Sequence, residues 1–466
     1  MTTNFDIAII GSGPGGYVAA IRASQLGLSV ALIERAEIGG VCLNWGCIPT
    51  KALLRSAEVF DLVKKSQDFG IDITSHSLNI DNIVKRSKKV AAKLSNGVKF
   101  LLAKNKVEVI RGNGTLLDNN RVSIEKENKD EDLIIKARNI VIATGARPRE
   151  IPGLKIDGLT VWDYKYALRP SQIPEKLIIV GSGAIGIEFA SFYNAIGSEV
   201  TVLEMQNRIL LAEDKDVANY AKNSFQKKGI KFVLGTSFEV ASLDKSSVTL
   251  RLNGEDNQEE ISAPKILVAA GVVGNVEGFG LEKVGVETKS GGILTDSFCE
   301  TSVKNIYAIG DVTAPPWLAH KASHEGVLVA ERIAGIKEVK TLDREKIPGC
   351  TYSSPQIASV GLTEDQALER GYDVKIGNVP FLANGKALAM GEDEGFVKTI
   401  FDVSTGELLG AHMVGAEVTE LISTFLVGKE LETTFEELTN TVFPHPTMSE
   451  ILHESVLSSE EKAIHY

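Results

Sequence analysis

From residue 5 to residue 34 the sequence reads FDIAIIGSGPGGYVAAIRASQLGLSVALIE, and from residue 176 to residue 204 it reads KLIIVGSGAIGIEFASFYNAIGSEVTVLE. Each stretch has an apolar run, a glycine-rich turn, a segment with helical spacing, and a second apolar run that ends in glutamate. This order is typical of the βαβ unit that binds a dinucleotide. One glycine-rich turn alone is weak support, but the complete pattern occurs twice. The sequence therefore predicts two dinucleotide-binding units.

The glycines and the terminal glutamate have separate functions in such a unit. The first glycine permits a tight turn, the second leaves room for the pyrophosphate, the third lets helix and strand pack closely, and the acid accepts hydrogen bonds from a ribose. The predicted residues are Gly11, Gly13, Gly16 and Glu34 in the first unit and Gly181, Gly183, Gly186 and Glu204 in the second. A carboxylate at Glu204 repels a 2′-phosphate, which predicts NAD rather than NADP as the second dinucleotide.

The rest of the chain predicts an α/β protein, and its 466 residues are enough for about three domains. Buried strands are expected at 138–148, 266–271 and 305–312, and long helices at 46–66 and 81–105. From about residue 346, strands rich in Val, Ile and Gly alternate with short helices, and 421–427 is apolar enough for a core or interface helix. We therefore expect two Rossmann-like dinucleotide-binding domains and a C-terminal α+β domain.

Composition excludes several classes of partner. The net charge is −11, which argues against nucleic acid or an anionic membrane, because both need clustered Lys and Arg. No apolar run approaches the roughly 20 residues of a membrane span, and no secretory signal is visible. The four cysteines are too few for a secreted disulfide framework. These features predict a cytoplasmic protein in a reducing compartment.

Two of the cysteines, Cys42 and Cys47, are five residues apart in GGVCLNWGCIPTKALL (39–54). A helix is predicted to begin near Cys47; its N-terminus would stabilise a thiolate, and Lys51 adds positive charge. A thiol with a lowered pKa can exchange with disulfides. The spacing alone leaves a redox pair, a static disulfide and two inert core thiols open, and it matches no zinc pattern. The position directly after the first dinucleotide unit favours the redox pair.

The segment 39–54 resembles the active-site segment of the pyridine nucleotide–disulfide oxidoreductases, and among them that of the lipoamide dehydrogenases. The similarity continues in order along essentially the whole chain, through IATG (142–145), YAIGDV (307–312), LAHKA (318–322) and HPTMSE (445–450). Motifs of this length in this order are specific for the superfamily and less specific for the substrate.

The resemblance implies FAD in the first unit and NAD in the second, with Cys42 as the interchange thiol and Cys47 as the thiol that faces the flavin. Further cofactor contacts are implied for Lys51, Gly114, Thr144, Gly145, Glu188, Gly271, Asp311 and Ala319. The implied division is an FAD-binding domain at 1–147, an NAD-binding domain at 148–275, a central segment completing the FAD site at 276–345, and a dimerisation domain at 346–466.

His445 and Glu450 lie in PHPTMSEILHE (444–454). Thiol exchange needs a base, a neutral imidazole suits neutral pH, and a carboxylate on the other ring nitrogen would fix the tautomer. On these grounds alone a structural histidine is the better interpretation. The match to the family's HPTxSE motif reverses it, and implies that the pair reaches the cysteines of the other subunit of an obligate homodimer.

The remaining histidines and cysteines are interpreted as structural. His320 and His324 are four residues apart, but no further ligand completes a metal site, so we expect a solvated helix with Glu325 off that face. His76, His412, His453 and His465 have no predicted partners. Cys299 and Cys350 are expected to be small buried hydrophobic residues.

The resemblance implies a dihydrolipoyl dehydrogenase, which oxidises dihydrolipoyl groups on a carrier domain of a 2-oxo acid dehydrogenase or glycine cleavage complex and reduces NAD⁺. The alternatives are another flavin disulfide reductase of the glutathione reductase type, a diaphorase, or a non-catalytic docking subunit. Glu204 disfavours a glutathione reductase, and the intact cysteine and histidine motifs disfavour the docking subunit. One departure from the family is GVVGN (271–275), which lacks a common Arg and Pro.

Overall fold

The computed structural model describes residues 3–126, 132–253 and 259–466. The chain forms two compact units, each assembled from three separate segments. The first unit consists of residues 1–53, 81–149 and 271–342, and the second of residues 54–80, 150–270 and 343–466. Among the described residues, no helix is both long enough and apolar enough to cross a membrane.

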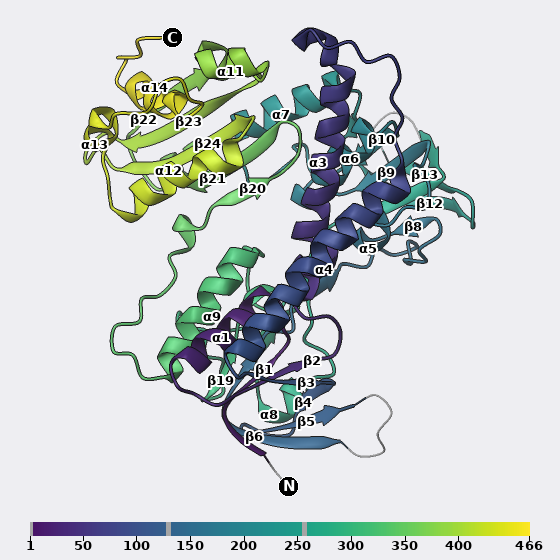
Figure 1. Ribbon diagram of the computed structural model, residues 1–466, viewed down its shortest axis with the longest axis vertical. Helices are drawn as coiled ribbons and strands as arrows, with labels where there is room; N and C mark the ends of the chain where they lie inside the picture. Colours follow the sequence, from purple (N-terminus) through teal and green to yellow (C-terminus); the bar gives the residue numbers. More distant parts are fainter. Residues whose placement is uncertain (1–2, 127–131, 254–258) are drawn as a thin grey trace. The chain divides into compact units, whose positions relative to one another are not determined.

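The first unit is built on a mostly parallel sheet (Figure 1). Its parallel strands are β1 (Thr3–Ile10), β2 (Val30–Glu34), β3 (Glu108–Arg111), β6 (Leu133–Ile142) and β19 (Ile306–Ala308). The antiparallel strands β4 (Asn113–Leu116) and β5 (Arg121–Glu125) extend it beyond β6. Alternate residues of β1 enter two different cores, with Ile7 and Ile9 on one face and Ala8 and Ile10 on the other. Burial on both faces explains the nearly continuous apolar sequence of β1.

Helices α1 (Pro14–Gln25) and α9 (Ala319–Ile333) pack against each other in this unit. The contact is made by small residues, because a Cβ on Gly326 would lie 2.6 Å from the carbonyl oxygen of Gly15. The unit also contains α2 (Gly40–Trp45), the start of α3 (Cys47–Lys64), and α4 (Ile80–Lys104). Both long helices lie within two residues of their predicted ends.

The second unit contains a second parallel sheet that repeats the first pattern. Its order is β11 (Lys231–Val233), β10 (Glu199–Leu203), β9 (Lys176–Val180), β15 (Lys265–Val268) and β8 (Val161–Trp162). The helices α6 (Ala184–Ala195) and α7 (Lys215–Lys227) follow β9 and β10. A three-stranded antiparallel sheet is formed by β12 (Ser237–Leu243), β13 (Val248–Asn253) and β14 (Glu260–Ala263).

The C-terminal part of the second unit is a five-stranded antiparallel sheet with helices. Its order is β20 (Gly349–Thr351), β21 (Gln356–Gly361), β24 (Leu408–Gly415), β23 (Gly395–Asp402) and β22 (Val374–Pro380). Every residue of β23 and β24 is buried. The helices are α10 (Glu364–Glu369), α11 (Gly385–Met390), α12 (Val418–Glu430), α13 (Phe435–Asn440) and α14 (Glu450–Ser459). The predicted fold class, two Rossmann-like domains and a C-terminal α+β domain, is confirmed.

Shorter elements complete the fold. They are β7 (Ala146–Pro148), β16 (Val272–Gly274), β17 (Thr288–Lys289), β18 (Gly292–Ile293), α5 (Tyr164–Ala167), α8 (Leu281–Val284), and the 3₁₀ turns η1 (Ser66–Phe69), η2 (Gly310–Val312), η3 (Arg344–Lys346) and η4 (Phe381–Ala383). The strand predicted at 305–312 is therefore only three residues long, and η2 follows it.

Two expectations about histidines are wrong. The helix of His320 and His324 is solvated only on their face, because Lys321 and Glu325 are buried on the other and form an ion pair of 2.9 Å. Three histidines without predicted partners do have them. Nε2 of His412 lies 2.8 Å from the carbonyl oxygen of Leu362, Nε2 of His453 lies 2.9 Å from that of Thr439, and Nδ1 of His465 lies 2.8 Å from Oε1 of Glu454. Cys299, as expected, is buried in the core, whereas Cys350 is only partly buried.

Burial of His412 predicts a pH dependence of stability. Desolvation lowers the pKa of His412 below its usual 6.5, against the carbonyl of Leu362 and the charge of Asp214, while Lys398 lowers it further. Below pH 6.5 the unfolded chain therefore binds a proton at His412 that the folded chain does not bind. The stabilisation that depends on a neutral imidazole is complete above pH 6.5 and is lost as the pH falls toward the pKa of the folded state. We expect His412→Gln to reduce the slope of unfolding free energy between pH 6.5 and 5 by up to about 1.4 kcal/mol per pH unit. Urea denaturation at several pH values measures this, and an unchanged slope would contradict it; His453→Gln is the control.

Candidate active site and dinucleotide sites

The first glycine-rich turn joins β1 to α1. Gly11 has φ +104°, and a Cβ there would lie 2.2 Å from the carbonyl oxygen of Ala143. A Cβ on Gly16 would lie 1.9 Å from the carbonyl oxygen of Gly11, so both positions require glycine for packing. A Cβ on Gly13 would meet no atom within 4 Å. The space beside Gly13 is therefore open, as a site for a pyrophosphate requires.

The helix that follows this turn leaves its first amides available. Gly13 is the N-cap of α1 and has no side chain to bond them. Unsatisfied N–H groups and the helix dipole favour an anion at this end of the helix. Glu34 lies beside the turn, because its Oε2 accepts hydrogen bonds from the amide of Ser12 at 2.8 Å and its hydroxyl at 2.6 Å. Glu34, the predicted hydrogen-bond acceptor for a ribose, therefore lies next to the glycine-rich turn.

The second turn, between β9 and α6, has the same construction. Gly181 has φ +103°, a Cβ on Gly186 would lie 2.0 Å from the carbonyl oxygen of Gly181, and a Cβ on Gly183 would meet nothing within 4 Å. Glu204 accepts hydrogen bonds from the amide of Ser182 at 3.0 Å and its hydroxyl at 2.8 Å. The equivalent serines of the two turns were missed in the sequence, although the repeated G-S-G triplet contains the signal.

The assignment of the open space at Gly183 to a pyrophosphate can be tested by filling that space. Gly183→Val should leave the fold and flavin content intact but raise the dissociation constant for ADP-ribose at least about 100-fold. This is the size of loss expected when a bound group is displaced by about 1 Å. Calorimetric titration measures the affinity, and absorbance measures flavin content. Gly97→Ala, in open space on α4, is the control. An unchanged affinity in Gly183→Val would contradict the assignment of this turn.

Cys42 and Cys47 form a disulfide, with their Cα atoms 4.8 Å apart. Cys42 lies in α2, and Cys47 is the first residue of α3. Pro49 is in the first turn of α3, where its missing N–H leaves no helix bond unmade. The predicted pairing and the position of Cys47 at a helix start are confirmed. Lys51 lies one turn farther along α3 and is half-buried.

Other predicted cofactor residues of the first unit lie on neighbouring loops. The hydroxyl of Thr144 donates to the carbonyl oxygen of Asn275 at 2.8 Å, and the amide of Asn275 donates to the carbonyl oxygen of Gly145 at 2.8 Å. Gly271 precedes β16 with φ +89°. The segment GVVGN (271–275), which departs from the family pattern, therefore still contains Asn275, the residue that holds the loop after β6.

Asp311, Ala319 and Gly114 occupy structured positions. Asp311 is in η2, and burial raises the pKa of its carboxyl, with Lys321 opposing and Glu325 adding to that rise. Ala319 is the first residue of α9. Gly114 is buried in β4, where a Cβ would lie 3.3 Å from Cγ2 of Ile33 in β2.

In the second unit, Glu188 is buried in α6. Its Oε1 accepts a hydrogen bond of 3.0 Å from the amide of Tyr352. Desolvation raises the pKa of the Tyr352 phenol to about 12, with further contributions from Cys350, Glu420 and Glu188. Sequence reasoning missed Tyr352, since 164 residues separate it from Glu188.

His445 and Glu450 also lie in the second unit and contact each other. Nδ1 of His445 is 2.9 Å from Oε1 of Glu450, and the imidazole is 80% exposed. The amide of Thr447 donates to Oε2 of Glu450 at 2.9 Å. This bond, then the imidazole of His445, lowers the pKa of Glu450 against the effect of burial. Glu450 is the first residue of α14, and its ionised carboxylate holds one ring nitrogen and leaves Nε2 exposed.

Comparison with known proteins agrees with this arrangement. Residues 5–326 match the pyridine nucleotide-disulphide oxidoreductase family, and residues 347–456 match the dimerisation domain of that family, which supports a homodimer. The chain is 51% identical to a dihydrolipoyl dehydrogenase of Zymomonas mobilis, with 100% of both chains covered. It is 50% identical to one of Rhizobium etli, with 98% of each covered, and 43% identical to one of Bacillus subtilis, with 100% of each covered.

Two solved structures have the same fold. LpdA from Mycobacterium tuberculosis superimposes with a TM-score of 0.90 at 27% identity, covering 98% of this chain and 99% of that one. The flavoprotein disulfide reductase RclA from Escherichia coli superimposes with a TM-score of 0.84 at 26% identity and the same coverage. With two dinucleotide turns, a disulfide at the start of α3 and matches over nearly its whole length, the chain belongs to the pyridine nucleotide-disulphide oxidoreductases.

Proposed function

We propose that the chain is a dihydrolipoyl dehydrogenase, which oxidises dihydrolipoyl groups and reduces NAD⁺ with FAD as its bound cofactor. The observation that carries this proposal is the Cys42–Cys47 disulfide at the N-terminus of α3. The relatives that are 43–51% identical over at least 98% of their lengths bear this name. FAD, when bound, supplies the chemistry that carries the electron pair from thiols to NAD⁺ as hydride.

Two exchange steps account for the oxidation of the substrate dithiol. A substrate thiolate attacks Sγ of Cys42, the bond between Cys42 and Cys47 breaks, and Cys47 leaves as a thiolate. The second substrate thiolate then attacks the substrate sulfur that is bonded to Cys42. The bond to Cys42 breaks, the cyclic lipoyl disulfide forms, and Cys42 leaves as a thiolate. The substrate loses two electrons and two protons, and the cysteine pair gains the electrons. The N-terminus of α3 stabilises the Cys47 thiolate.

The exchange also needs a base for the substrate protons, and we assign it to Nε2 of His445. Glu450 holds Nδ1, which fixes the tautomer and stabilises the imidazolium once the proton is taken. Support for this role comes from the exposure of the imidazole and from the lowered pKa of Glu450. We propose that, in the homodimer, each His445–Glu450 pair serves the cysteine pair of the partner subunit.

Residues of this chain fit both dinucleotides. We assign to FAD Gly11, Gly13, Gly16, Glu34, Lys51, Gly114, Thr144, Gly145, Gly271, Asp311 and Ala319. We assign to NAD Gly181, Gly183, Gly186, Glu188 and Glu204. The two open positions at Gly13 and Gly183 support these assignments, because they are where the family pattern needs room for phosphates. We propose that the FAD-binding domain spans 1–147, the NAD-binding domain 148–275, the central segment 276–345 and the dimerisation domain 346–466.

The natural substrate is proposed to be a lipoyl group on a carrier domain of a 2-oxo acid dehydrogenase or glycine cleavage complex. The exposure of His445 supports a large substrate, because a flexible carrier must reach the base. We also propose a cytoplasmic location, since a dithiol enzyme with Cys299 and Cys350 as thiols suits a reducing compartment.

A substrate comparison tests this function. The purified holoenzyme is assayed with dihydrolipoamide and either NAD⁺ or NADP⁺, and with NADH or NADPH and glutathione disulfide. We expect rapid turnover only with dihydrolipoamide and NAD⁺, because Glu204 disfavours a 2′-phosphate. Preferred reduction of glutathione disulfide would instead identify a reductase of the glutathione type.

A further inference from the structure

We propose that Lys398, in β23 of the C-terminal sheet, is a positioning residue for the NAD site, because it anchors the loop 205–214 that supports the second glycine turn. This inference rests on the proposed assignment of that turn to NAD. It concerns the second unit alone, which contains the turn, the loop and the sheet.

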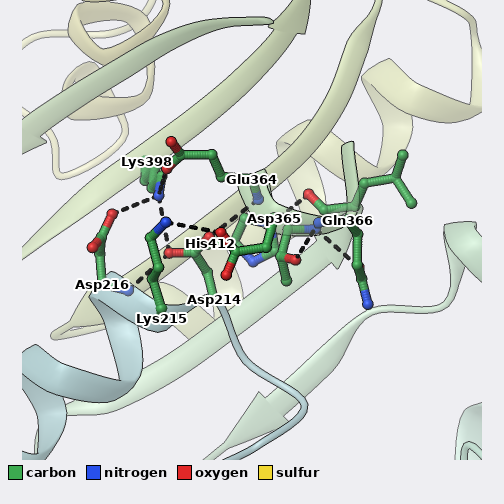
Figure 2. A network of polar contacts seen from close by, with 10 residues as sticks. Asp214, Lys215, Asp216, Glu364, Asp365, Gln366, Lys398 and His412 are labelled. Carbon is green, nitrogen blue, oxygen red and sulfur yellow. Dashed lines mark hydrogen bonds and ion pairs between the residues drawn. The ribbon is translucent and has the colours of Figure 1, made fainter. Parts of the chain in front are cut away.

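Lys398 lies at the centre of the polar cluster shown in Figure 2. Its side chain is 1% exposed. Nζ lies 3.0 Å from Oδ1 of Asp214, 2.6 Å from Oδ2 of Asp216 and 2.7 Å from Oε2 of Glu364. All three hydrogens of the ammonium group therefore have carboxylate acceptors. These acceptors come from α7 and its N-cap and from α10, so one side chain connects two helices to the sheet.

The charges in this cluster are firmly held. Burial alone would lower the pKa of Lys398, but the bonds to Asp216 and Glu364 and the charge of Asp214 raise it above its usual value. Burial alone would raise the pKa of Asp214, yet His412 and Lys398 lower it overall. The lysine and this aspartate are both ionised at neutral pH. Removal of the lysine would leave a buried carboxylate without its counter-ion, which is strongly unfavourable.

The sheet side of the cluster is fixed by register. Lys398 is directly opposite His412 on β24, and His412 is directly opposite Ser359 on β21, so the three side chains share one face of the sheet. The contact of His412 with Leu362 holds the segment before α10. The amide of Glu364, the first residue of α10, donates to Oδ2 of Asp214 at 3.2 Å. Asp214 is therefore held from both the strand and the helix.

A short path of bonds joins Asp214 to the glycine turn. Asp214 caps α7 by accepting a bond of 3.0 Å from the amide of Asp216. The amide of its neighbour Glu213 donates to the carbonyl oxygen of Leu210 at 2.9 Å, and the amide of Leu210 donates to the carbonyl oxygen of Ser182 at 3.1 Å. Leu210 is buried with φ +48°, a left-handed conformation that a leucine keeps only when its surroundings enforce it.

Ser182 is the residue through which this path reaches the proposed NAD contacts. It lies between Gly181 and Gly183, and both its amide and its hydroxyl bond to Glu204. If the anchor at Asp214 is lost, Leu210 is free to leave its left-handed conformation and release the carbonyl of Ser182. The turn and Glu204 would then lose their alignment together. The loss should appear in dinucleotide affinity and not in the dithiol exchange, which uses residues of other segments.

The test compares Lys398→Met with Lys215→Met in the holoenzyme. Lys215 is the matched control, because it is adjacent to Asp214 but forms an exposed pair of 2.8 Å with Asp365. ADP-ribose, which has the pyrophosphate and both riboses but cannot be reduced, is titrated by calorimetry. We expect the dissociation constant of Lys398→Met to rise about 10-fold, within the range of coupling through a packed network. Lys215→Met should be unchanged. The rate of disulfide reduction by dihydrolipoamide, followed anaerobically, should be unchanged in both.

Equal ADP-ribose affinity in wild type and Lys398→Met would overturn the proposal, as would an equal loss of both readouts in a folded variant. If Lys398→Met does not fold, Asp216→Asn is used, since its carboxylate is 45% exposed and its loss leaves the bond of Lys398 to Asp214. A smaller loss of ADP-ribose affinity with normal dithiol exchange is then expected, and no loss would overturn the proposal. Failure of dihydrolipoamide as a substrate would contradict the proposed function without changing the ADP-ribose result.

Discussion

Cys47→Ser is expected to abolish the reduction of NAD⁺ by dihydrolipoamide. Serine cannot form the disulfide with Cys42, so the variant lacks the electrophilic sulfur that the substrate thiolate attacks. The loss should be on the order of 10³-fold or more, the scale on which removal of a covalent catalytic group lowers turnover in other enzymes. The measurement is the initial rate of NADH formation at saturating substrate.

A second assay separates loss of the thiol from loss of the fold. Oxidation of NADH by ferricyanide does not need the disulfide, so Cys47→Ser should retain it. Cys299→Ala is the matched control, because it removes a buried thiol outside the disulfide and should keep both activities. Retained lipoamide turnover in Cys47→Ser would contradict the exchange scheme.

His445→Gln is expected to give the second large loss. Glutamine has no basic nitrogen for the proton of the substrate thiol, so kcat should fall between about 10²- and 10⁴-fold, the usual contribution of a general base. The measurement is kcat for dihydrolipoamide at saturating substrate and neutral pH.

Glu450→Gln tests the support that Glu450 gives to His445. The amide oxygen can still accept the bond from Thr447, but the negative charge beside Nδ1 is gone. We expect a loss intermediate between wild type and His445→Gln. His76→Gln, on an exposed segment, is the control and should behave as wild type. A His445→Gln enzyme with normal kcat would assign the base elsewhere.

Much of the dinucleotide architecture could be predicted from the sequence because it is local. A strand, a turn with Gly11, Gly13 and Gly16, a helix and a terminal acid are contiguous, and their spacing is set by the backbone geometry of one βαβ unit. The Cys42–Cys47 pair is also local, because Cys42 lies in the short helix α2 and Cys47 is the first residue of the next helix, α3. Such features leave a signal in a window of about 30 residues, the length of one βαβ unit.

The Lys398 cluster has no comparable local signal. Its members are separated by up to 184 residues, and each is an ordinary charged residue in its own segment. The segment GFVKTIFD contains a lysine among apolar residues, and this lysine is buried because both faces of β23 are covered. The same holds for His412 in β24, whose partner, the carbonyl oxygen of Leu362, is 50 residues away in the sequence. Both polar side chains can be buried only because their partners come from other segments.

The partner of Glu188 shows the same limit on a smaller scale. Its place after the second glycine turn could be predicted, whereas the amide of Tyr352 that holds it comes from the C-terminal part of the second unit. The hydrogen bonds of Ser12 and Ser182 could be predicted from the sequence only in part. They belong to the repeated G-S-G triplets, but only the structure gives their carboxylate acceptors.

Anaerobic titration of the yellow holoenzyme with dihydrolipoamide, followed by addition of NAD⁺, tests the proposed function most directly. We predict a long-wavelength absorbance band as the disulfide is reduced and the Cys47 thiolate appears beside the flavin. Addition of NAD⁺ should remove this band while NADH is formed. If dihydrolipoamide leaves the spectrum unchanged while NADH reduces the enzyme, the Cys42–Cys47 disulfide serves another substrate and the account is contradicted.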